Sequence, residues 1–229
     1  MAPRPRQAQL RITLNGDNIL ESPRTIPVLD CLHFDHVGTA GRVHDEEGIL
    51  YYLATAGRTR PWLNPAKQGI VKVDGTRAAV GSLEAIVDVE VQPFYTISVA
   101  DAWISVEIIG YVVRPTGFVI SRGRLIGPTS FVLQASLDGQ HWVDIIHWRR
   151  HHGVDLSHID GSMFVSVNTA DAFWSHFRLR QTCPNELYGN SVYYNRYGNG
   201  YIPKRGMPDQ PVLAFAVSAL ELYGDLKAA

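Results

Sequence analysis

The stretch "FVLQASLDGQHW", Phe131–Trp142, decides the fold. Every second residue from Phe131 to Leu137 is apolar, and Gln134 and Ser136 fall between them. Successive side chains of a β-strand point to opposite faces, so this period of two predicts a strand with one face in a core. Leu137 is therefore expected to point inward with the other apolar residues.

The residues that follow predict how this strand ends. Asp138-Gly139 tolerates the positive φ angles of a tight hairpin, so the stretch "HWVDIIHW" that comes next is expected to pair antiparallel with the first strand. Trp142 opens the second strand and is expected to lie in the core.

Similar stretches recur along the chain and predict further strands. "WISVEII" is expected to bury Ile104, Val106 and Ile108, and "HFRLRQT" to bury Phe177 and Leu179 while Arg178 and Arg180 point outward. "ILYYLAT" (49–55) and "FAVSALELYG" (215–224) are also expected to be strands, Asp74-Gly75 a turn, and Ser82–Glu90 one short helix. Many short strands with turn signals between them predict a β-sandwich or barrel.

Composition narrows the class of protein. The 229 residues suit one domain with extensions or at most two small domains, and a net charge of −1 does not favour nucleic acid or an anionic membrane. No apolar run approaches the roughly 20 residues that span a bilayer, and the first residues lack the apolar core of a signal peptide. We expect a soluble cytoplasmic protein with Cys31 and Cys183 reduced; a single disulfide is the alternative.

The loop "HWRRHHGVDLSHID", His147–Asp160, holds four of the nine histidines and two aspartates. A metal site needs ligands that converge, and the adjacent His151 and His152 do not usually point at one ion. The loop is close to the His-His-x-x-x-Asp-Gly signature of certain acyltransferases, but its aspartate, Asp155, comes one residue early. We expect a solvated surface loop, with a metal at His152 and either Asp155 or His158 left as the alternative.

Other catalytic patterns are absent from the sequence. It has no Gly-x-Ser-x-Gly elbow, no phosphate-binding Gly-rich loop and no Cys-x-x-Cys pair. We therefore expect no catalytic residue, no metal and no cofactor.

An ordered set of motifs resembles a known family. The block from Phe34 ("FDHVGTAGRVHDEEGILYYLATAGRTRPWLNPAKQGIVKV") is followed by a strand led by Trp103, then Arg114-Pro115, the Asp-Gly turn before Trp142, Phe177-Arg178 and a closing "ELYG" at 221–224. The set resembles the discoidin-like (F5/8 type C, galactose-binding-like) domains. Its closest likeness is to the intracellular branch found in BTB-domain proteins and a HECT-type ubiquitin ligase.

The resemblance implies an all-β, antiparallel β-sandwich of the discoidin or galactose-binding-like jelly-roll type with little helix. We expect an N-terminal arm over residues 1–27 and the sandwich over 28–229, with a long insertion at 188–211. The chain departs from the family at Gly117, where an aromatic residue or His is usual, and at Pro128–Phe131.

Candidate binding residues lie in two places. The insertion Tyr188–Pro211 is rich in Tyr, Gly, Asn and Pro, and tyrosine and arginine are favoured at interfaces. It forms either a loop that packs on its own domain or a docking surface; stacking of sugar or phosphate groups is a third reading. The candidate residues there are Tyr193, Tyr194, Arg196, Tyr197, Tyr201, Lys204 and Arg205.

The second place is "GRTRPWLNP", Gly57–Pro65. Arg58 and Arg60 are candidates for partner binding, whereas Trp62 and Asn64 are expected to fix the loop.

The sequence therefore predicts a non-enzymatic protein-interaction or scaffold module. The resemblance implies a subunit or adaptor of a larger intracellular assembly, either related to a ubiquitin ligase or ciliary or cytoskeletal. No HECT, BTB or RING segment is found, so ubiquitin transfer by the chain itself is not expected. The alternative is a carbohydrate-binding module with an aromatic platform at one end of the sandwich, and an enzyme that uses the histidine loop is third.

Overall fold

Two antiparallel sheets form the frame of the molecule. The computed structural model describes residues 31–36, 46–90, 92, 94–97, 99–121, 130–149, 162–182 and 215–229. The predicted arm (1–27) and insertion (188–211) lie outside these residues. The elements are β1 (Leu32–Phe34), α1 (Ile49–Ala54), β2 (Val71–Gly75), β3 (Ala78–Val80), the 3₁₀ helix η1 (Leu83–Val87), β4 (Tyr95–Thr96), β5 (Trp103–Ile108), β6 (Tyr111–Ser121), β7 (Ser130–Ser136), β8 (Val143–Arg149), β9 (Ser162–Ser166), β10 (His176–Gln181) and β11 (Ala219–Ala228).

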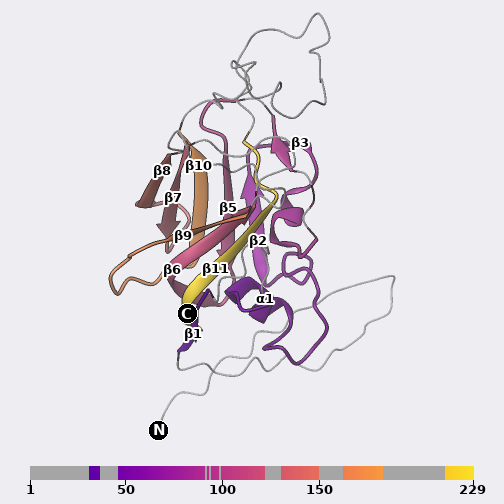
Figure 1. Ribbon diagram of the computed structural model, residues 1–229, viewed down its shortest axis with the longest axis vertical. Coiled ribbons are helices and arrows are strands. Elements are labelled where there is room, and N and C mark those ends of the chain that lie inside the picture. Colours follow the sequence, from indigo (N-terminus) through magenta and orange to yellow (C-terminus); the bar gives the residue numbers. More distant parts are fainter. Residues whose placement is uncertain are drawn as a thin grey trace, which may run out of the picture.

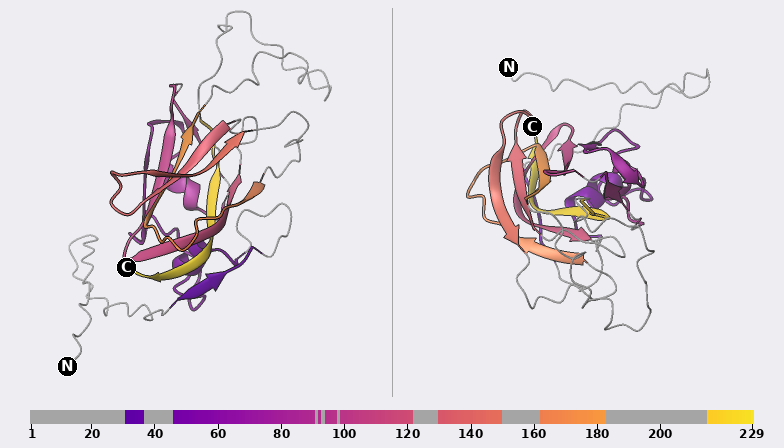
Figure 2. Two further views of the ribbon diagram at one scale, coloured as in Figure 1. Left: turned by 90° about the vertical axis from the view of Figure 1, so that its left-hand side faces the viewer. Right: turned by 90° about the horizontal axis from the view of Figure 1, so that it is seen from above.

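The strand order defines a β-sandwich, as the sequence predicts. One sheet has the order β1-β11-β6-β9 and the other β2-β5-β10-β7-β8, while β3 and β4 form a separate ribbon. In Figure 1 the long strands β6 and β11 run diagonally across β5 and β10 of the other sheet. Residues 46–90, which include α1, η1 and the edge strand β2 of the five-stranded sheet, gather on one side of the molecule (Figure 2, right).

The alternation seen in the sequence places side chains in the core. Phe177 and Leu179 of β10 are buried, as predicted, and so are Ile104, Val106 and Ile108 of β5. They pack between the sheets with Phe118 of β6 and Leu222 of β11, among other residues. The period of two therefore assigned the inner and outer faces of both strands correctly.

The hairpin at Asp138-Gly139 is confirmed, but Leu137 is not buried as predicted. β7 and β8 pair antiparallel on either side of the turn. The Ser136 hydroxyl oxygen accepts hydrogen bonds from the backbone N–H groups of Asp138 (3.2 Å) and Gly139 (3.0 Å), so the turn already starts at Ser136. Leu137 lies within this turn and is 61% exposed.

Asp74-Gly75 is not the hairpin turn that its sequence suggests. Gly75 is the last residue of β2, and β2 pairs with β5 instead of the strand that follows it. A Cβ atom at Gly75 would lie 2.7 Å from the carbonyl oxygen of Trp103. Glycine is needed here because two strands approach closely, not because the chain reverses.

The stretch "ILYYLAT", predicted as a strand, forms α1. The first N–H groups of a helix have no partner within it. Here the backbone N–H of Leu50 donates to Glu221 Oε1 (2.7 Å) and that of Tyr51 to Glu221 Oε2 (3.2 Å). Glu221 belongs to β11 and is fully buried. A buried carboxylate from a distant strand therefore stabilises a helix start that the local pattern does not reveal.

Gly48 leaves the space that this carboxylate needs. A Cβ atom at Gly48 would lie 2.1 Å from the carboxyl carbon of Glu221. The short helix predicted within Ser82–Glu90 is present as η1. Together α1 and η1 are the only helices among the described residues, which agrees with the predicted low helix content.

We expect Glu221→Ala to lower the free energy of unfolding by about 2–4 kcal/mol, because a buried N–H group left unpaired costs about 1–3 kcal/mol. Glu221→Gln keeps one acceptor and should cost less. Chemical denaturation measures both, and Glu84→Ala, at an exposed position of η1, is the control. A loss at Glu221 no larger than the roughly 0.5 kcal/mol usual for surface substitutions would contradict this role.

Candidate interaction surface

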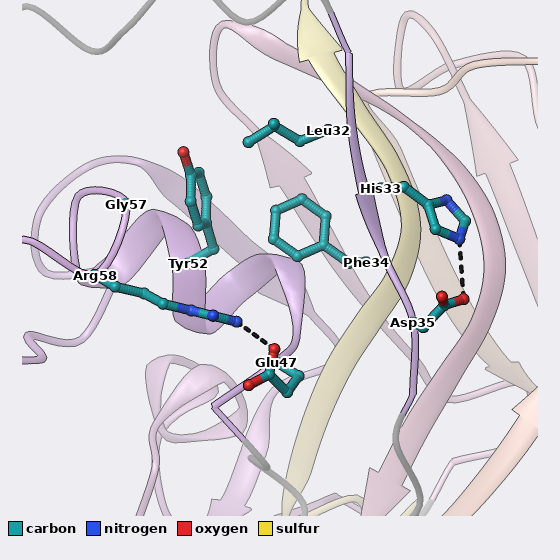
Figure 3. A pocket seen from close by; sticks show the side chains of 8 residues that line it. All are labelled: Leu32, His33, Phe34, Asp35, Glu47, Tyr52, Gly57 and Arg58. Carbon is teal, nitrogen blue, oxygen red and sulfur yellow. Dashed lines mark hydrogen bonds and ion pairs between the residues drawn. The ribbon is translucent and has the colours of Figure 1, made fainter.

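A hollow of about 450 Å³ lies beside the edge strand β1 (Figure 3). The Phe34 ring packs edge-on against Tyr52, with ring centroids 5.1 Å apart, and gives one apolar wall. On the rim, Arg58 forms an ion pair with Glu47 at 2.5 Å. The lining residues are Leu32, His33, Phe34, Asp35, Glu47, Tyr52, Gly57 and Arg58.

The two candidate arginines of the Gly57–Pro65 loop differ in their surroundings. Arg58 lies on the rim of the hollow, where Glu47 neutralises it, and it also donates to the Glu46 carbonyl oxygen at 3.0 Å. Arg60 is exposed and does not line the hollow. Arg58 is therefore engaged in local contacts, whereas Arg60 is exposed at the surface.

Asn64 has the loop-fixing role that the sequence predicts. It is buried, its side-chain oxygen accepts from the Ala66 N–H (2.9 Å), and its amide donates to the Glu84 carbonyl oxygen and to Asp88 Oδ2, both at 3.0 Å. Trp62 is half-buried.

A row of charged side chains crosses β1, β11 and β6. Asp225 of β11 lies in register with His33 of β1 and Arg114 of β6. Its carboxylate contacts His33 Nδ1 at 2.5 Å and accepts from Arg114 Nε at 2.6 Å. The row continues to Asp35, 2.9 Å from His33 Nε2, and to Asp171, 2.7 Å from an Arg114 amino group. These contacts tie the edge strand to the middle of its sheet.

The contacts shift the protonation of the row. The hydrogen bond with Asp225, followed by that with Asp35, raises the pKa of His33 above its ordinary 6.5. Burial by itself would raise the pKa of Asp225, but the hydrogen bonds from His33 and Arg114 outweigh it and hold that pKa below 3.8. His33 and Asp225 are therefore charged together over a wider pH range than the same side chains would be in isolation.

The outer face of the five-stranded sheet carries what we call the Trp–Arg platform: Trp103, Gln134, Trp142, Arg178 and Arg180. The Arg178 guanidinium carbon lies 4.0 Å from the centre of the Trp142 ring and 5.9 Å from that of Trp103. Arg178 Nε donates to Gln134 Oε1 at 2.8 Å. Cation–π contact and a side-chain amide thus hold one arginine in place.

Trp142 is half-buried on this outer face, so its predicted place in the core is wrong. Its indole N–H donates to the Gly139 carbonyl oxygen at 3.1 Å, and its ring lies at 90° to that of His176. Trp142 comes just before β8 begins at Val143, and the turn sets its ring over Arg178. The alternation along "HFRLRQT" placed Arg178 outward, but we did not predict its tryptophan partner.

The remaining candidates fall mainly outside the described residues. Tyr193, Tyr194, Arg196, Tyr197, Tyr201, Lys204 and Arg205 all do, as does most of the histidine loop. Of that loop the structure describes His147–Arg149, and His147 Nε2 lies 3.0 Å from Asp144. Within the described ranges no three His, Cys, Asp or Glu side chains are grouped as a metal site.

Over the same ranges, no helix has the length and apolar character needed to cross a membrane.

Sequence comparison relates the chain to two ubiquitin ligases. It is 29% identical over 154 residues to E3 ubiquitin-protein ligase Ufd4 of Drosophila melanogaster, a match that covers 62% of this chain. It is 30% identical over 169 residues to E3 ubiquitin-protein ligase hecd-1 of Caenorhabditis elegans, covering 65% of this chain. The chain spans only 6% of the length of each ligase. The predicted resemblance to a segment of a ubiquitin ligase is confirmed.

No family model matches the chain. Among solved structures, CpGH89CBM32-5 from Clostridium perfringens, in complex with GalNAc-β-1,3-galactose, has a TM-score of 0.46 and 13% identity over 68% of this chain and 96% of its own. The family 32 carbohydrate-binding module of C. perfringens NanJ, in complex with galactose, has a TM-score of 0.45 and 10% identity over 68% and 95%. The assignment as a β-sandwich rests on the two sheets of the chain itself.

We expect Trp142→Ala to lower the free energy of unfolding by about 1–2 kcal/mol, since a half-buried ring over a cation loses a modest contact. Phe177→Ala, in the core, should cost about 3–5 kcal/mol. Denaturant unfolding of both variants measures the difference. Equal losses would place Trp142 in the core after all.

We also expect the contribution of His33 to stability to depend on pH. A pKa raised on folding stabilises the folded state fully below the unfolded value, about 6.5, and the effect is lost as the pH rises through the folded pKa. The wild type should therefore exceed His33→Gln in melting temperature by more at pH 5.5 than at pH 8.5. A difference that is constant or grows with pH would contradict the His33–Asp225 contact.

Proposed function

We propose that this chain is a non-enzymatic interaction module of a larger assembly that contains ubiquitin-ligase activity. The observation that carries the proposal is the similarity to two E3 ubiquitin-protein ligases, which is confined to 6% of each ligase. A match of this size is expected of one module shared by larger proteins. In this proposal the partners are proteins and the module works in the cytoplasm. The larger assembly can also belong to the cytoskeleton or to a cilium.

The roles of the described carboxylates support a binding module. Glu221 holds the start of α1 and Asp225 holds β1 to β6. Asp138, whose pKa is lowered most by the His141 side chain, organises the β7–β8 turn by accepting from the backbone of Gln140 and His141. These groups, which would be the first candidates for acid–base chemistry, are engaged in holding the sandwich together.

The insertion Tyr188–Pro211 is our proposed main contact with the assembly. β10 ends at Gln181, so the chain leaves the five-stranded sheet a few residues before the insertion begins. A connection this long is usually functional when a compact domain contains it. Tyr193, Tyr194, Arg196, Tyr197 and Tyr201 would supply the contact area, and Lys204 and Arg205 the charged rim.

The test is affinity purification of the tagged chain from cells that express it, followed by a ubiquitin-chain assay on the eluate with E1, E2 and ATP added. We expect ligase activity in the wild-type eluate and none in the chain purified alone. Substitution of Tyr193, Tyr194, Tyr197 and Tyr201 by serine should remove that activity and leave thermal unfolding nearly unchanged.

Each other outcome would change the proposal. Loss of folding in the tyrosine variant means that these rings pack on their own domain. If the tyrosine variant keeps the ligase activity in its eluate, the contact is instead made by Arg58 and Arg60. The double variant Arg58→Ala, Arg60→Ala tests this. The double variant Lys67→Ala, Lys72→Ala removes the same charge and is its control. A wild-type eluate without ligase activity, together with specific hits on a glycan array, would favour the carbohydrate-binding alternative.

A further inference from the structure

Arg178 of the Trp–Arg platform is held in place yet keeps unused hydrogen-bond donors. The Trp142 ring and Gln134 fix the guanidinium, and Gln134 is itself fixed by Asp144, 2.6 Å from its amide nitrogen. Among the described residues, Nε is the only Arg178 nitrogen that forms a hydrogen bond, and none of these residues forms an ion pair with Arg178. An oriented guanidinium with free amino groups is suited to bind a carboxylate through two parallel hydrogen bonds.

Arg180 adds a second cation two residues along the same strand. Its Nε is buried without a hydrogen-bond partner, and its nearest carboxylate among the described residues is Asp101, 4.0 Å away and largely exposed. Arg178 and Arg180 both point away from the core, since Phe177, Leu179 and Gln181 are the buried positions of β10. Two guanidinium groups with unused donors therefore lie side by side on one face.

Among the described residues of this face, no acidic side chain forms an ion pair with Arg178, although Asp74 of β2 lies two strands away in the same cross-strand row. Asp144 contacts both Gln134 and His147, and Glu107 lies 3.7 Å from His176. β5, β10, β7 and β8 lie next to one another in the sheet (Figure 1), so these residues surround the platform. The charge of the two arginines is thus left mainly for an acidic group from outside the domain.

We propose that the Trp–Arg platform binds an extended acidic segment of a partner protein, with carboxylates at alternate positions. Residues two apart on a strand are separated by about 6.6–6.8 Å, so carboxylates at i and i+2 of an extended segment match the spacing of Arg178 and Arg180. Trp103 and Trp142 flank the arginines, and tryptophan and arginine are enriched among residues that dominate binding energy. This deepens the proposed function by naming the chemistry of a partner.

The test is an NMR titration of the purified chain, in which the Nε–Hε signals of the arginines are followed. The probes are two capped peptides of equal composition, GEGEGEG and EEGGEGG, of which only the first has carboxylates at i and i+2. We expect the alternating peptide to shift the Arg178 and Arg180 signals saturably and to bind several-fold more tightly than its isomer. Arg178→Gln should weaken its binding about tenfold, as expected for the loss of a hydrogen bond to a charged group.

Arg149→Gln is the matched control, because it removes the same charge from an exposed position of β8 on the same sheet. Its affinity for GEGEGEG should stay within about twofold of the wild type. Arg180→Gln is the second variant should Arg178→Gln fail to fold, and thermal unfolding is recorded for all three.

Two results would overturn the proposal. Equal affinity for the two peptides with equal losses in Arg178→Gln and Arg149→Gln would reduce the binding to general electrostatics. Absence of shifts in the wild type would limit the platform to holding the sheet together. The titration uses the chain alone, without ligase, so its failure leaves the co-purification result intact, and failure of co-purification leaves the peptide result intact.

Discussion

The carboxylate of Glu221 is the interaction on which the arrangement of this molecule depends. It lies at the start of α1, where two backbone N–H groups need an acceptor, and it comes from β11, in the middle of the four-stranded sheet. Burying a charge is costly unless hydrogen bonds compensate it. The donors of Leu50 and Tyr51 provide that compensation, so the helical side of the molecule and the sandwich stabilise each other.

β11 carries a second acidic residue, whose side chain binds side chains of the two neighbouring strands. Asp225 joins His33 and Arg114 across the sheet, while Leu222 and Leu226 of β11 face the core. One strand thus combines apolar contacts with two charged anchors. Glu221 and Asp225 are occupied in this way, whereas Arg178 on the outer face of the other sheet keeps unused hydrogen-bond donors.

The sequence predicts β5, β7, β8, β10 and β11 because their signals are local. The alternation in β5 and β10 and the Asp-Gly turn between β7 and β8 depend on neighbouring residues alone. The helix at Ile49–Ala54 escapes prediction because its stabilising carboxylate is 171 residues away. Asp74-Gly75 misleads because close approach of two strands and a tight turn both require glycine.

The candidate site was predictable only in part, for a similar reason. Alternation puts Arg178 on the outer face, but finding Trp142 above it requires the register of β10 on β7 together with the turn into β8. Arg58 was selected for its residue type, and its partner Glu47 turned out to be local. Pattern in a sequence assigns a face to a residue; the contacts on that face depend on how distant strands align.

The position of β11 has a consequence for how the protein is made. A ribosome synthesises β11 after all the other described elements, so β1 and α1 emerge long before Asp225 and Glu221, which lie 192 and 171 residues further along the chain from their partners. Contacts over such separations form slowly, because a long loop must close first. Until then β6 lacks the neighbouring strand on one edge and the first N–H groups of α1 lack their acceptor, and the nascent chain needs protection from aggregation. A chain whose synthesis ends shortly before Ala219 would lack the strand that joins its parts.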